Sequence, residues 1–424
     1  MNEQTDPSGR ASFPMSIIGI AFLVLAVSFA SRAVLGLGMQ EWSATFGWSR
    51  GEMSVAGSIA LVAMAATVSL AGHAADRLGA RLVLGLGCAV IAAGLGVIAG
   101  MTTYWQLILG YGLLCGMGFG LVSLPVAGSL LAHCVPNRQG LATGLATSGA
   151  SGGQFLILPV LAALFPIVGW RGGMAVFAVL AALASIIALV GLGAEPTRSN
   201  RAEPGGRAQC LLARVVAIVR TRAFQGLFWS FTICGFASTG IVETHFIPFA
   251  QMCGFSTVAS TNAYGVFAFF NLVGMIGAGV LADRMNQRFL LAGIYLVRSV
   301  ALIVPLFVGA HYPMLIFFSV LIGVAFYATF PATIGLCRAH FGMESLGLVV
   351  GLLTVGHALG AALGASFGGY AYDLFLRYDS MWIGAVFFAL TSALFAMLVP
   401  DPHSKSEHRT TGIGSSAVGF ALKS

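Results

Sequence analysis

The sequence predicts an all-α membrane protein whose twelve transmembrane helices form two parallel repeats of six helices each. Composition is the first indication. Hydrophobic residues make up 58% of the 424 residues and charged residues only 8%, against roughly 25% charged residues in a typical soluble domain. A soluble chain of this composition would expose too much apolar surface. The other two indications are a series of apolar stretches long enough to cross a bilayer and an internal repeat of motifs.

Twelve apolar stretches follow one another along the chain, each of about 20 residues. The predicted helices of the first half are residues 15–37, 53–74, 82–101, 106–131, 140–166 and 173–193. Those of the second half are residues 224–250, 259–281, 289–309, 314–337, 346–371 and 380–399. The predicted organisation is therefore a tail at 1–13, a first half at 14–193, a linker at 194–222, a second half at 223–400 and a tail at 401–424.

A charged motif between the second and third stretches occurs again in the second half, 207 positions later. The residues of interest in the two copies are Gly72, Asp76, Arg77, Gly79 and Arg81, and then Asp283, Arg284 and Arg288. The same offset relates Gly47-Trp48-Ser49 to Gly254-Phe255-Ser256, and four glycines at 140, 144, 149 and 153 to glycines at 347, 351, 356 and 360. Two copies of an apolar unit in one orientation are typical of transporters built from parallel repeats.

The G-x-x-x-D-R-x-G-x-R pattern of residues 72–81 resembles the loop between helices 2 and 3 of the major facilitator superfamily. The second copy departs from it only in carrying Asn286 where the first copy has Gly79. The resemblance implies a secondary active transporter whose two halves rock around a central site. We expect the charged loops to act as a conformational gate that ties neighbouring helix ends together when the cytoplasmic side is closed.

Two short stretches resemble bacterial relatives of the monocarboxylate porters. They are Phe-Gly-Trp-Ser-Arg at 46–50 and Asn-Arg-Gln-Gly-Leu-Ala-Thr-Gly at 137–144. The resemblance implies proton-coupled uptake of an organic anion. The sequence departs from the pattern of the monocarboxylate porters at two places. The predicted helix at 259–281 has no arginine, and the first helix lacks the acidic, glycine-rich opening of that group.

The distribution of basic residues predicts the orientation. If both termini are cytoplasmic, sixteen of the 21 lysines and arginines lie on the cytoplasmic side, as the positive-inside rule requires. We therefore expect a multi-pass protein of the bacterial inner membrane, with residues 207–222 as an amphipathic segment on the anionic inner leaflet. The net charge of +7 reflects this topology and lipid contact. We expect no nucleic-acid partner, and we expect the protein to be a monomer.

Two ionisable side chains within the spans are the main candidates for function, because such groups are costly in a membrane. The 207 offset pairs Gly36 with Glu243, so Arg32 and Glu243 occupy nearly equivalent positions about one turn apart. Arg32 can hold a substrate carboxylate, pair with Glu243, or lock its helix to a neighbour. Glu243 is the leading proton carrier. Burial favours its neutral form and a nearby arginine its charged form, and the sequence leaves both open.

Three further ionisable residues are weaker candidates. His245 follows Glu243 by two residues and either relays a proton or caps the helix end. His357 replaces the small Ala150 of the first repeat and is a candidate substrate contact. Arg298 lies in the ninth predicted helix, which the resemblance places outside the bundle, so a structural role is favoured over substrate contact.

Polar residues and glycines inside the helices complete the predictions. Gln154, Asn271 and Tyr327 interrupt small or apolar runs and are candidate substrate contacts. Gly-x-x-x-Gly spacings in helices 4, 5 and 11 let helices approach closely, and we expect them to let the two halves slide. The seven cysteines are scattered and are predicted to be small core residues. Neither an enzyme-like triad nor a metal cluster nor a phosphate loop occurs, so no cofactor, no metal and no ATP hydrolysis is expected.

Two functions are carried forward. The first is uptake of a small organic anion, with Arg32 as anchor and Glu243 or His245 as proton site. The second is uptake of a largely neutral aromatic metabolite such as a vitamin, held by Gln154, Asn271 and Tyr327. Drug efflux is less expected, because residues 149–153 read Gly-Ala-Ser-Gly-Gly where drug antiporters need Gly-Pro. A non-transporting sensor is the least expected.

Overall fold

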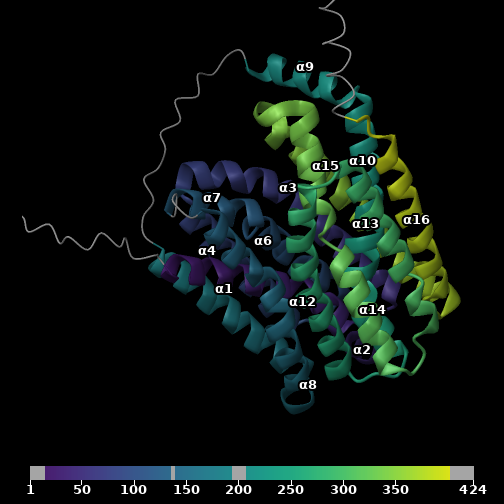
Figure 1. The fold of residues 1–424 in the computed structure, drawn as a ribbon. Coiled ribbons are helices and arrows are strands. Elements are labelled where there is room, and N and C mark those ends of the chain that lie inside the picture. Colours follow the sequence, from purple (N-terminus) through teal and green to yellow (C-terminus); the bar gives the residue numbers. More distant parts are fainter. Residues whose placement is uncertain (1–14, 135–138, 193–206, 402–424) are drawn as a thin grey trace, which may run out of the picture.

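The structure is a computed structural model that describes residues 15–134, 139–192 and 207–401. The described residues form helices and connecting turns, with no β-strand among them. Helices of the first half, coloured purple to blue, lie mainly on the left of Figure 1, and those of the second half, coloured teal to yellow, on the right. The short helix α9 (Arg207–Val219) crosses the upper end. The prediction of an all-helical fold is confirmed.

The first half contains nine helical elements among the described residues. They are α1 (Met15–Arg32), α2 (Val34–Phe46), α3 (Arg50–Leu78), α4 (Ala80–Ala99), α5 (Tyr104–Leu107), the π-helix η1 (Ile108–Cys115), α6 (Gly116–Leu121), α7 (Leu124–Cys134) and α8 (Gln139–Gly191). The long α8 covers two predicted spans. Its backbone leaves the helical conformation at Gly169, where φ is 70°, so the chain bends there.

The second half begins after α9. It contains α10 (Arg222–Gly235), the π-helix η3 (Phe236–Glu243), α11 (Thr244–Met252), α12 (Thr257–Ala282), α13 (Gln287–Ala301), the 3₁₀ turn η4 (Val304–Phe307), α14 (Tyr312–Ala325), α15 (Thr329–Phe375) and α16 (Asp379–Leu398). The helix α15 also covers parts of two predicted spans and breaks at Gly342, where φ is 71°.

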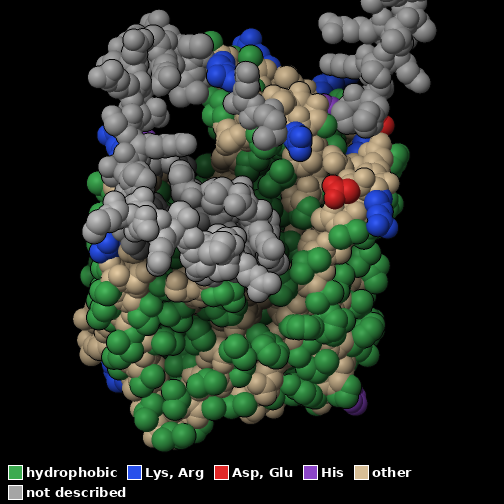
Figure 2. Space-filling model, turned by 60° about the vertical axis from the view of Figure 1, so that its left-hand side comes forward, with side chains coloured by type: hydrophobic (Ala, Val, Ile, Leu, Met, Phe, Trp, Pro, Cys, Tyr) green, Lys and Arg blue, Asp and Glu red, His purple; other side chains and the backbone are tan. Residues whose placement is uncertain are grey.

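Ten helical segments of the described chain are long and apolar enough to cross a membrane. One of these segments, residues 144–191, contains the break at Gly169 and matches two predicted spans. The continuous α10–η3–α11 segment is not among the ten. The multi-pass architecture is therefore confirmed, whereas the number twelve stays a prediction. Hydrophobic side chains cover the body of the molecule, and charged ones gather towards the upper end (Figure 2).

The backbone reproduces the internal repeat at several turns. Gly47 and Gly254, which are 207 positions apart, both adopt positive φ, at 72° and 92°. Gly169 and Leu376 have the same separation, and Leu376 is the one non-glycine residue of the described chain with positive φ. Ser49 begins α3 and accepts a hydrogen bond from the amide three residues ahead. Its repeat partner Ser256 does the same for α12. The two halves therefore use the same turns at the same positions.

The first helix of each half is irregular at the same point of the repeat. In the first half, the helix is interrupted at Ala33, between α1 and α2. In the second half, the equivalent position lies in the π-helix η3, which ends at Glu243. Short π segments are frequent at functional sites, because they turn side chains away from the regular helical positions. These two irregular segments carry Arg32 and Glu243.

Several glycines of helices 4, 5 and 11 pack within one half, whereas an added Cβ would meet nothing within 4 Å at Gly144, Gly347 or Gly351, so a sliding role stays a prediction for these three alone. A Cβ on Gly153 would lie 2.0 Å from the carbonyl oxygen of Ala26 in α1, within the first half. A Cβ on Gly360 would lie 2.0 Å from the carbonyl oxygen of Thr232 in α10, within the second half. Gly116 likewise faces α3. Gly116, Gly153 and Gly360 let helices approach closely, as such spacings predict, and their close contacts lie within one half.

Candidate functional site

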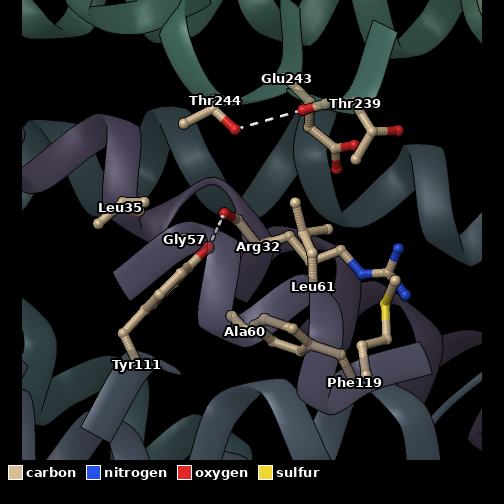
Figure 3. A pocket seen from close by; sticks show the side chains of 11 residues that line it. Arg32, Leu35, Gly57, Ala60, Leu61, Tyr111, Phe119, Thr239, Glu243 and Thr244 are labelled. Atoms are coloured by element: carbon tan, nitrogen blue, oxygen red, sulfur yellow. Dashed lines mark hydrogen bonds between the residues drawn. The ribbon is translucent and has the colours of Figure 1, made fainter. Parts of the chain in front are cut away.

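The candidate site is a cavity between the two halves. Two adjoining hollows of about 150 Å³ and 30 Å³ share Arg32, Leu61 and Met64 of the first half and Thr239 of the second. Figure 3 shows the smaller one, with Arg32 and Glu243 extending into it from helices of opposite halves. A site at the interface between repeats is where transporters of this architecture bind their substrates.

Arg32 is held in the cavity by its backbone and by aromatic rings. The Tyr111 hydroxyl donates a 2.5 Å hydrogen bond to the Arg32 carbonyl, across the ends of two helices. The guanidinium carbon lies 4.0 Å from the centre of the Phe29 ring and 5.6 Å from that of Phe119. Such stacking favours a cation, but it leaves the N–H donors free. The buried Nε has no hydrogen-bond partner in the described chain. The guanidinium is therefore able to bind an anion.

Glu243 is a buried carboxyl with no hydrogen bond of ordinary geometry to a described residue, although the Thr239 side chain lies beside it. Only 7% of its surface is exposed, and neither carboxyl oxygen has a hydrogen-bond partner among the described residues. Thr244 next to it donates instead to the Thr239 carbonyl, at 3.2 Å. Burial opposes a negative charge on this carboxyl, whereas the positive charge of Arg32 on the same cavity favours one.

Arg32 and Glu243 lie on one cavity without forming an ion pair. Within the described chain, the one ion pair with atoms closer than 4.0 Å joins Arg377 and Asp379 at the surface. Locking of Arg32 to Glu243 is therefore not the arrangement of this structure, although both side chains reach the same space. Each has unfilled hydrogen-bonding capacity that a substrate or a proton can use.

The larger hollow is lined mainly by aromatic and aliphatic side chains. Phe231, Phe326 and Phe330 contribute three aromatic rings from the second half. His357 packs edge-on against Phe231, with ring centres 4.7 Å apart and planes at 73°. Tyr327 packs against Phe326, with ring centres 4.9 Å apart. Of the five predicted substrate contacts, Arg32, Tyr327 and His357 thus line the cavity.

The other two predicted substrate contacts do not line either hollow. Gln154 is buried, and its amide donates to the Tyr264 hydroxyl at 3.3 Å and to the Phe29 carbonyl at 3.5 Å. Asn271 is also buried, and its side-chain oxygen accepts the backbone N–H of Tyr327 at 3.0 Å. In this structure both amides hold protein segments in place. Asn271 can act on the site only by positioning Tyr327.

His245 and Arg298 are fully buried away from the two hollows. Nε2 of His245 is 2.9 Å from the carbonyl oxygen of Ala365 in α15. Arg298 donates from one terminal nitrogen to Cys234 Sγ at 2.7 Å and from the other to the carbonyls of Ala325 and Phe326. These contacts support the structural role predicted for Arg298.

A polar cluster at one end of the molecule joins the two halves, and sequence reasoning missed it. The carboxylate of Asp373, at the end of α15, accepts hydrogen bonds from the first two amides of α3, Arg50 N at 3.0 Å and Gly51 N at 2.7 Å. A carboxylate at a helix N-terminus is favoured by the helix dipole and the free N–H groups. The one signal in the sequence was that Arg50 belongs to the Phe-Gly-Trp-Ser-Arg stretch at 46–50, which resembles bacterial relatives of the monocarboxylate porters.

Arg50 contributes its side chain to the same cluster. Its guanidinium donates to the Tyr378 hydroxyl at 2.6 Å and to the Pro248 carbonyl at 3.3 Å, and it stacks on Tyr372 at 3.8 Å. Burial raises the pKa of Tyr378 to about 12, although the Arg50 charge opposes the shift. The phenol therefore stays protonated and accepts the hydrogen bond from Arg50. We call Arg50, Asp373 and Tyr378 the Arg50 cluster.

The predicted gate loops lie near the other end. Gly79 adopts a φ of 85° at the junction of α3 and α4, and the Asp283 and Arg284 side chains are exposed. The side chain of Asp76 lies outside the described part. Among described residues, hydrogen bonds between the two halves occur in the Arg50 cluster, from Ser58 to α15 and from Gln154 to Tyr264. No such bond is described for the side chains of Arg77, Arg81, Asp283 or Arg284.

Comparison with known proteins identifies the chain. The sequence profile of the Major Facilitator Superfamily matches residues 21–308 and 263–422. The chain belongs to the major facilitator superfamily. It is a multi-pass membrane transporter, as the repeated motif predicted, and not an enzyme.

Several curated relatives of this superfamily member are described as transporters. An uncharacterized MFS-type transporter of Bacillus subtilis, YcxA, is 23% identical over 82% of this chain and 86% of its own length. Monocarboxylate transporter 13 of Bos taurus is 23% identical over 90% of this chain and 88% of its own. A riboflavin transporter of Saccharomyces cerevisiae is 28% identical over 59% of this chain and 50% of its own.

Solved structures of the superfamily share the fold. A bacterial homologue of the human lysosomal transporter Spinster superposes with a TM-score of 0.74 at 18% identity, covering 93% of this chain and 98% of that one. A D-xylose–proton symporter superposes with a TM-score of 0.70 at 17% identity, covering 92% and 99%. At these identities the likeness concerns the arrangement of helices alone.

Proposed function

We propose that this transporter moves a small organic anion together with a proton, by alternating access around the Arg32–Glu243 cavity. The observation that supports it is a guanidinium with free donors and a carboxyl without hydrogen bonds on the same cavity between the halves. The guanidinium suits a carboxylate, which it can hold by two parallel hydrogen bonds. The monocarboxylate transporter among the relatives is consistent with such a substrate.

The charges of the cavity support coupling to one proton. With Arg32 cationic and Glu243 anionic, the empty cavity is neutral. A bound carboxylate takes over Arg32, and Glu243 is then left as a buried charge without a partner, which is costly. Protonation of Glu243 removes this cost. One proton therefore accompanies one monovalent anion, and the transport cycle carries no net charge.

The Arg50 cluster and the two charged loops supply the alternating gates in this proposal. The Arg50 cluster holds the two halves together at one end, while no hydrogen bond between the halves is described for the side chains of Arg77, Arg81, Asp283 or Arg284. Asp76-Arg77 and Asp283-Arg284 form their ties when their own end closes and the Arg50 cluster opens. The distribution of basic residues supports a cytoplasmic position for the loops and the termini, in a bacterial inner membrane.

Uptake into liposomes tests the coupling. The purified chain is reconstituted, and labelled carboxylates are offered with either a pH gradient or a membrane potential imposed. We expect accumulation with the lumen alkaline and none with the potential alone. In Glu243→Gln, we expect exchange of substrate across the membrane to persist while the pH gradient no longer drives accumulation. Accumulation driven by the potential alone would contradict the one-proton, one-anion cycle.

A neutral aromatic metabolite remains the second candidate. The aromatic lining of the larger hollow and the riboflavin transporter among the relatives favour it. In that case Arg32 serves to balance Glu243. The double variant Arg32→Gln with Glu243→Gln should then regain part of the activity that each single variant loses. Under the anion proposal, the double variant stays as inactive as Arg32→Gln.

A further inference from the structure

We infer that the substrate is a monovalent carboxylate carrying a single aromatic ring. The inference rests on the proposed function, and it specifies the class of anion. It is carried by the combination, in one hollow, of a single cation, an aromatic wall and a volume that suits one ring. Short aliphatic acids, dicarboxylates and sugars fit this combination less well.

The size of the larger hollow is the first argument. Its volume is about 150 Å³, and an apolar cavity of about 150 Å³ in another protein binds one benzene molecule. A two-carbon or three-carbon acid would leave most of the aromatic wall without contacts, whereas one ring matches this volume. Arg32 lines this hollow and the smaller one beside it. A carboxylate at Arg32 can therefore extend its ring into the larger hollow.

The charge of the hollow limits the substrate to one negative charge. Among the described residues that line the two hollows, Arg32 is the only arginine or lysine. Arg298 is engaged by Cys234 and by two carbonyls, and it lines neither hollow. A second carboxylate would therefore lie against aromatic rings with no cation to pair with, and an unpaired buried charge is costly.

Two hydroxyls of the wall offer no donor to a polyhydroxylated substrate. The Ser238 hydroxyl donates to the Cys234 carbonyl at 2.5 Å, and the Thr354 hydroxyl donates to the Val350 carbonyl at 2.8 Å. Both donors are used within their own helices. The rings of Phe231, Phe326 and Phe330 line the same hollow, beside Thr239, Tyr327, Thr329 and His357. Aromatic pairs prefer edge-to-face or offset contacts, which a substrate ring can make here.

Binding of a graded series of small acids tests the inference. Isothermal titration calorimetry on the purified full-length chain, at about pH 6, measures ionised acids without interference from passive permeation. We expect benzoate to bind about 2- to 10-fold more tightly than cyclohexanecarboxylate, which has the same size without the aromatic ring. Phthalate, most of which carries a second negative charge at this pH, should bind at least about 3-fold more weakly. Acetate should also bind more weakly than benzoate.

A pair of phenylalanine variants tests whether the preference for an aromatic acid arises in the larger hollow. Phe330→Leu removes one ring of the hollow, and benzoate affinity should fall about 2- to 10-fold while cyclohexanecarboxylate affinity changes less. Phe387→Leu is the matched control, because Phe387 is 64% exposed on α16 and does not line the hollow. Its benzoate affinity should stay within about twofold of the parent. If either variant fails to fold, the affinities of the graded acids for the unaltered chain still test whether the site prefers an aromatic carboxylate.

The outcomes separate this inference from the proposed function. Suppose that acids bind in an Arg32-dependent way, but acetate or phthalate binds as tightly as benzoate. The anion proposal then stands and the aromatic specificity is overturned. Suppose instead that benzyl alcohol binds as tightly as benzoate, and that Arg32→Gln leaves both unchanged. The anion proposal itself then fails, and the aromatic carboxylate fails with it.

Discussion

Arg32 and Arg298 are both arginines of membrane-embedded helices, but their guanidinium groups have opposite surroundings. Arg298 is fully buried and donates to Cys234 and to the carbonyls of Ala325 and Phe326, all within its own half. Arg32 is half-buried on the central cavity, and its side chain makes no described hydrogen bond. A guanidinium whose two terminal nitrogens are engaged by the protein holds a fold together, whereas one whose terminal nitrogens are free at a cavity can bind a ligand.

Arg50 is intermediate between them. Its hydrogen bonds are filled, but by residues of the other half, Pro248 and Tyr378. Such bonds exist only while that end of the molecule is closed. The three arginines thus suggest three separable roles, in binding, in conformational balance and in stability. Substitutions at each should move a different measured quantity.

The largest effect is expected at Arg32. Arg32→Gln removes a desolvated ionic contact worth about 2–5 kcal/mol, which is roughly a 30-fold or greater loss of carboxylate affinity. Arg32→Lys should recover little, because an ammonium lacks the planar pair of donors. Calorimetric binding measures the affinity, and the unfolding temperature serves as the control, which should change little. A large fall in unfolding temperature would place Arg32 beside Arg298 as a structural residue.

Arg298 should show the reverse pattern. Arg298→Met keeps an unbranched apolar side chain but leaves the Ala325 and Phe326 carbonyls without their donor, at a cost of about 1–3 kcal/mol. We expect a lower unfolding temperature and less folded protein, with carboxylate affinity within about twofold of the parent. Thermal unfolding in detergent and binding to the folded fraction measure the two quantities. A loss of carboxylate affinity without a loss of stability would mean that Arg298, like Arg32, acts in substrate binding, and would contradict the structural role given to it.

The Arg50 cluster should control the balance between states. Asp373→Asn weakens the cap on α3, an effect of about 0.5–2 kcal/mol, which shifts a two-state equilibrium up to about 30-fold towards opening at this end. Spin labels at the exposed Ala44 and Leu374, one in each half, report the separation of the halves at this end. We expect more of the long-distance population, and a change in transport rate larger than the change in affinity.

Asp76→Asn is the matched control for the gate at the opposite end. If the charged loops close that end, this variant should move the same distance distribution towards the short population. If the two variants shift the distance distribution in the same direction, or if neither shifts it, the two ends of the molecule do not act as opposing gates.

The smallest effect is expected at the surface ion pair of Arg377 and Asp379. Its atoms are 2.7 Å apart, but the side chains are 74% and 43% exposed, and exposed pairs contribute about 0–1 kcal/mol. Arg377→Ala should change the unfolding temperature, affinity and rate only marginally. An effect comparable to that of Asp373→Asn would mean that charge at this end, rather than the particular contacts of the Arg50 cluster, sets the balance.

Much of the architecture could be predicted from the sequence, because a bilayer imposes its requirements residue by residue. Each span needs about 20 apolar residues, and the repeat offset of 207 is visible in motifs such as Gly47-Trp48-Ser49 and Gly254-Phe255-Ser256. The same offset placed Arg32 and Glu243 at equivalent depths, and the structure indeed has both on one cavity. Depth along a helix and identity of the residue suffice for such predictions.

The direction in which a side chain points could not be predicted in the same way. Gln154 and Asn271 have the polarity and depth of ligand contacts, but each is engaged by a distant segment, through Tyr264 and through the Tyr327 backbone. Gly116 and Gly360 have the spacing of a sliding surface, but their close neighbours belong to their own half. Which partner lies opposite a helix face depends on how all helices are arranged.

The sequence by itself determined that the chain is a helical membrane protein with a duplicated architecture and few ionisable groups at its centre. Only the tertiary structure decided which of these groups are free. It left Arg32 and Glu243 without hydrogen-bond partners, engaged Arg298 and His245, and brought Asp373 to the start of α3 across 323 positions of the chain. The physical reason is that hydropathy is a property of each residue, whereas hydrogen-bond satisfaction belongs to pairs that meet only in the folded molecule.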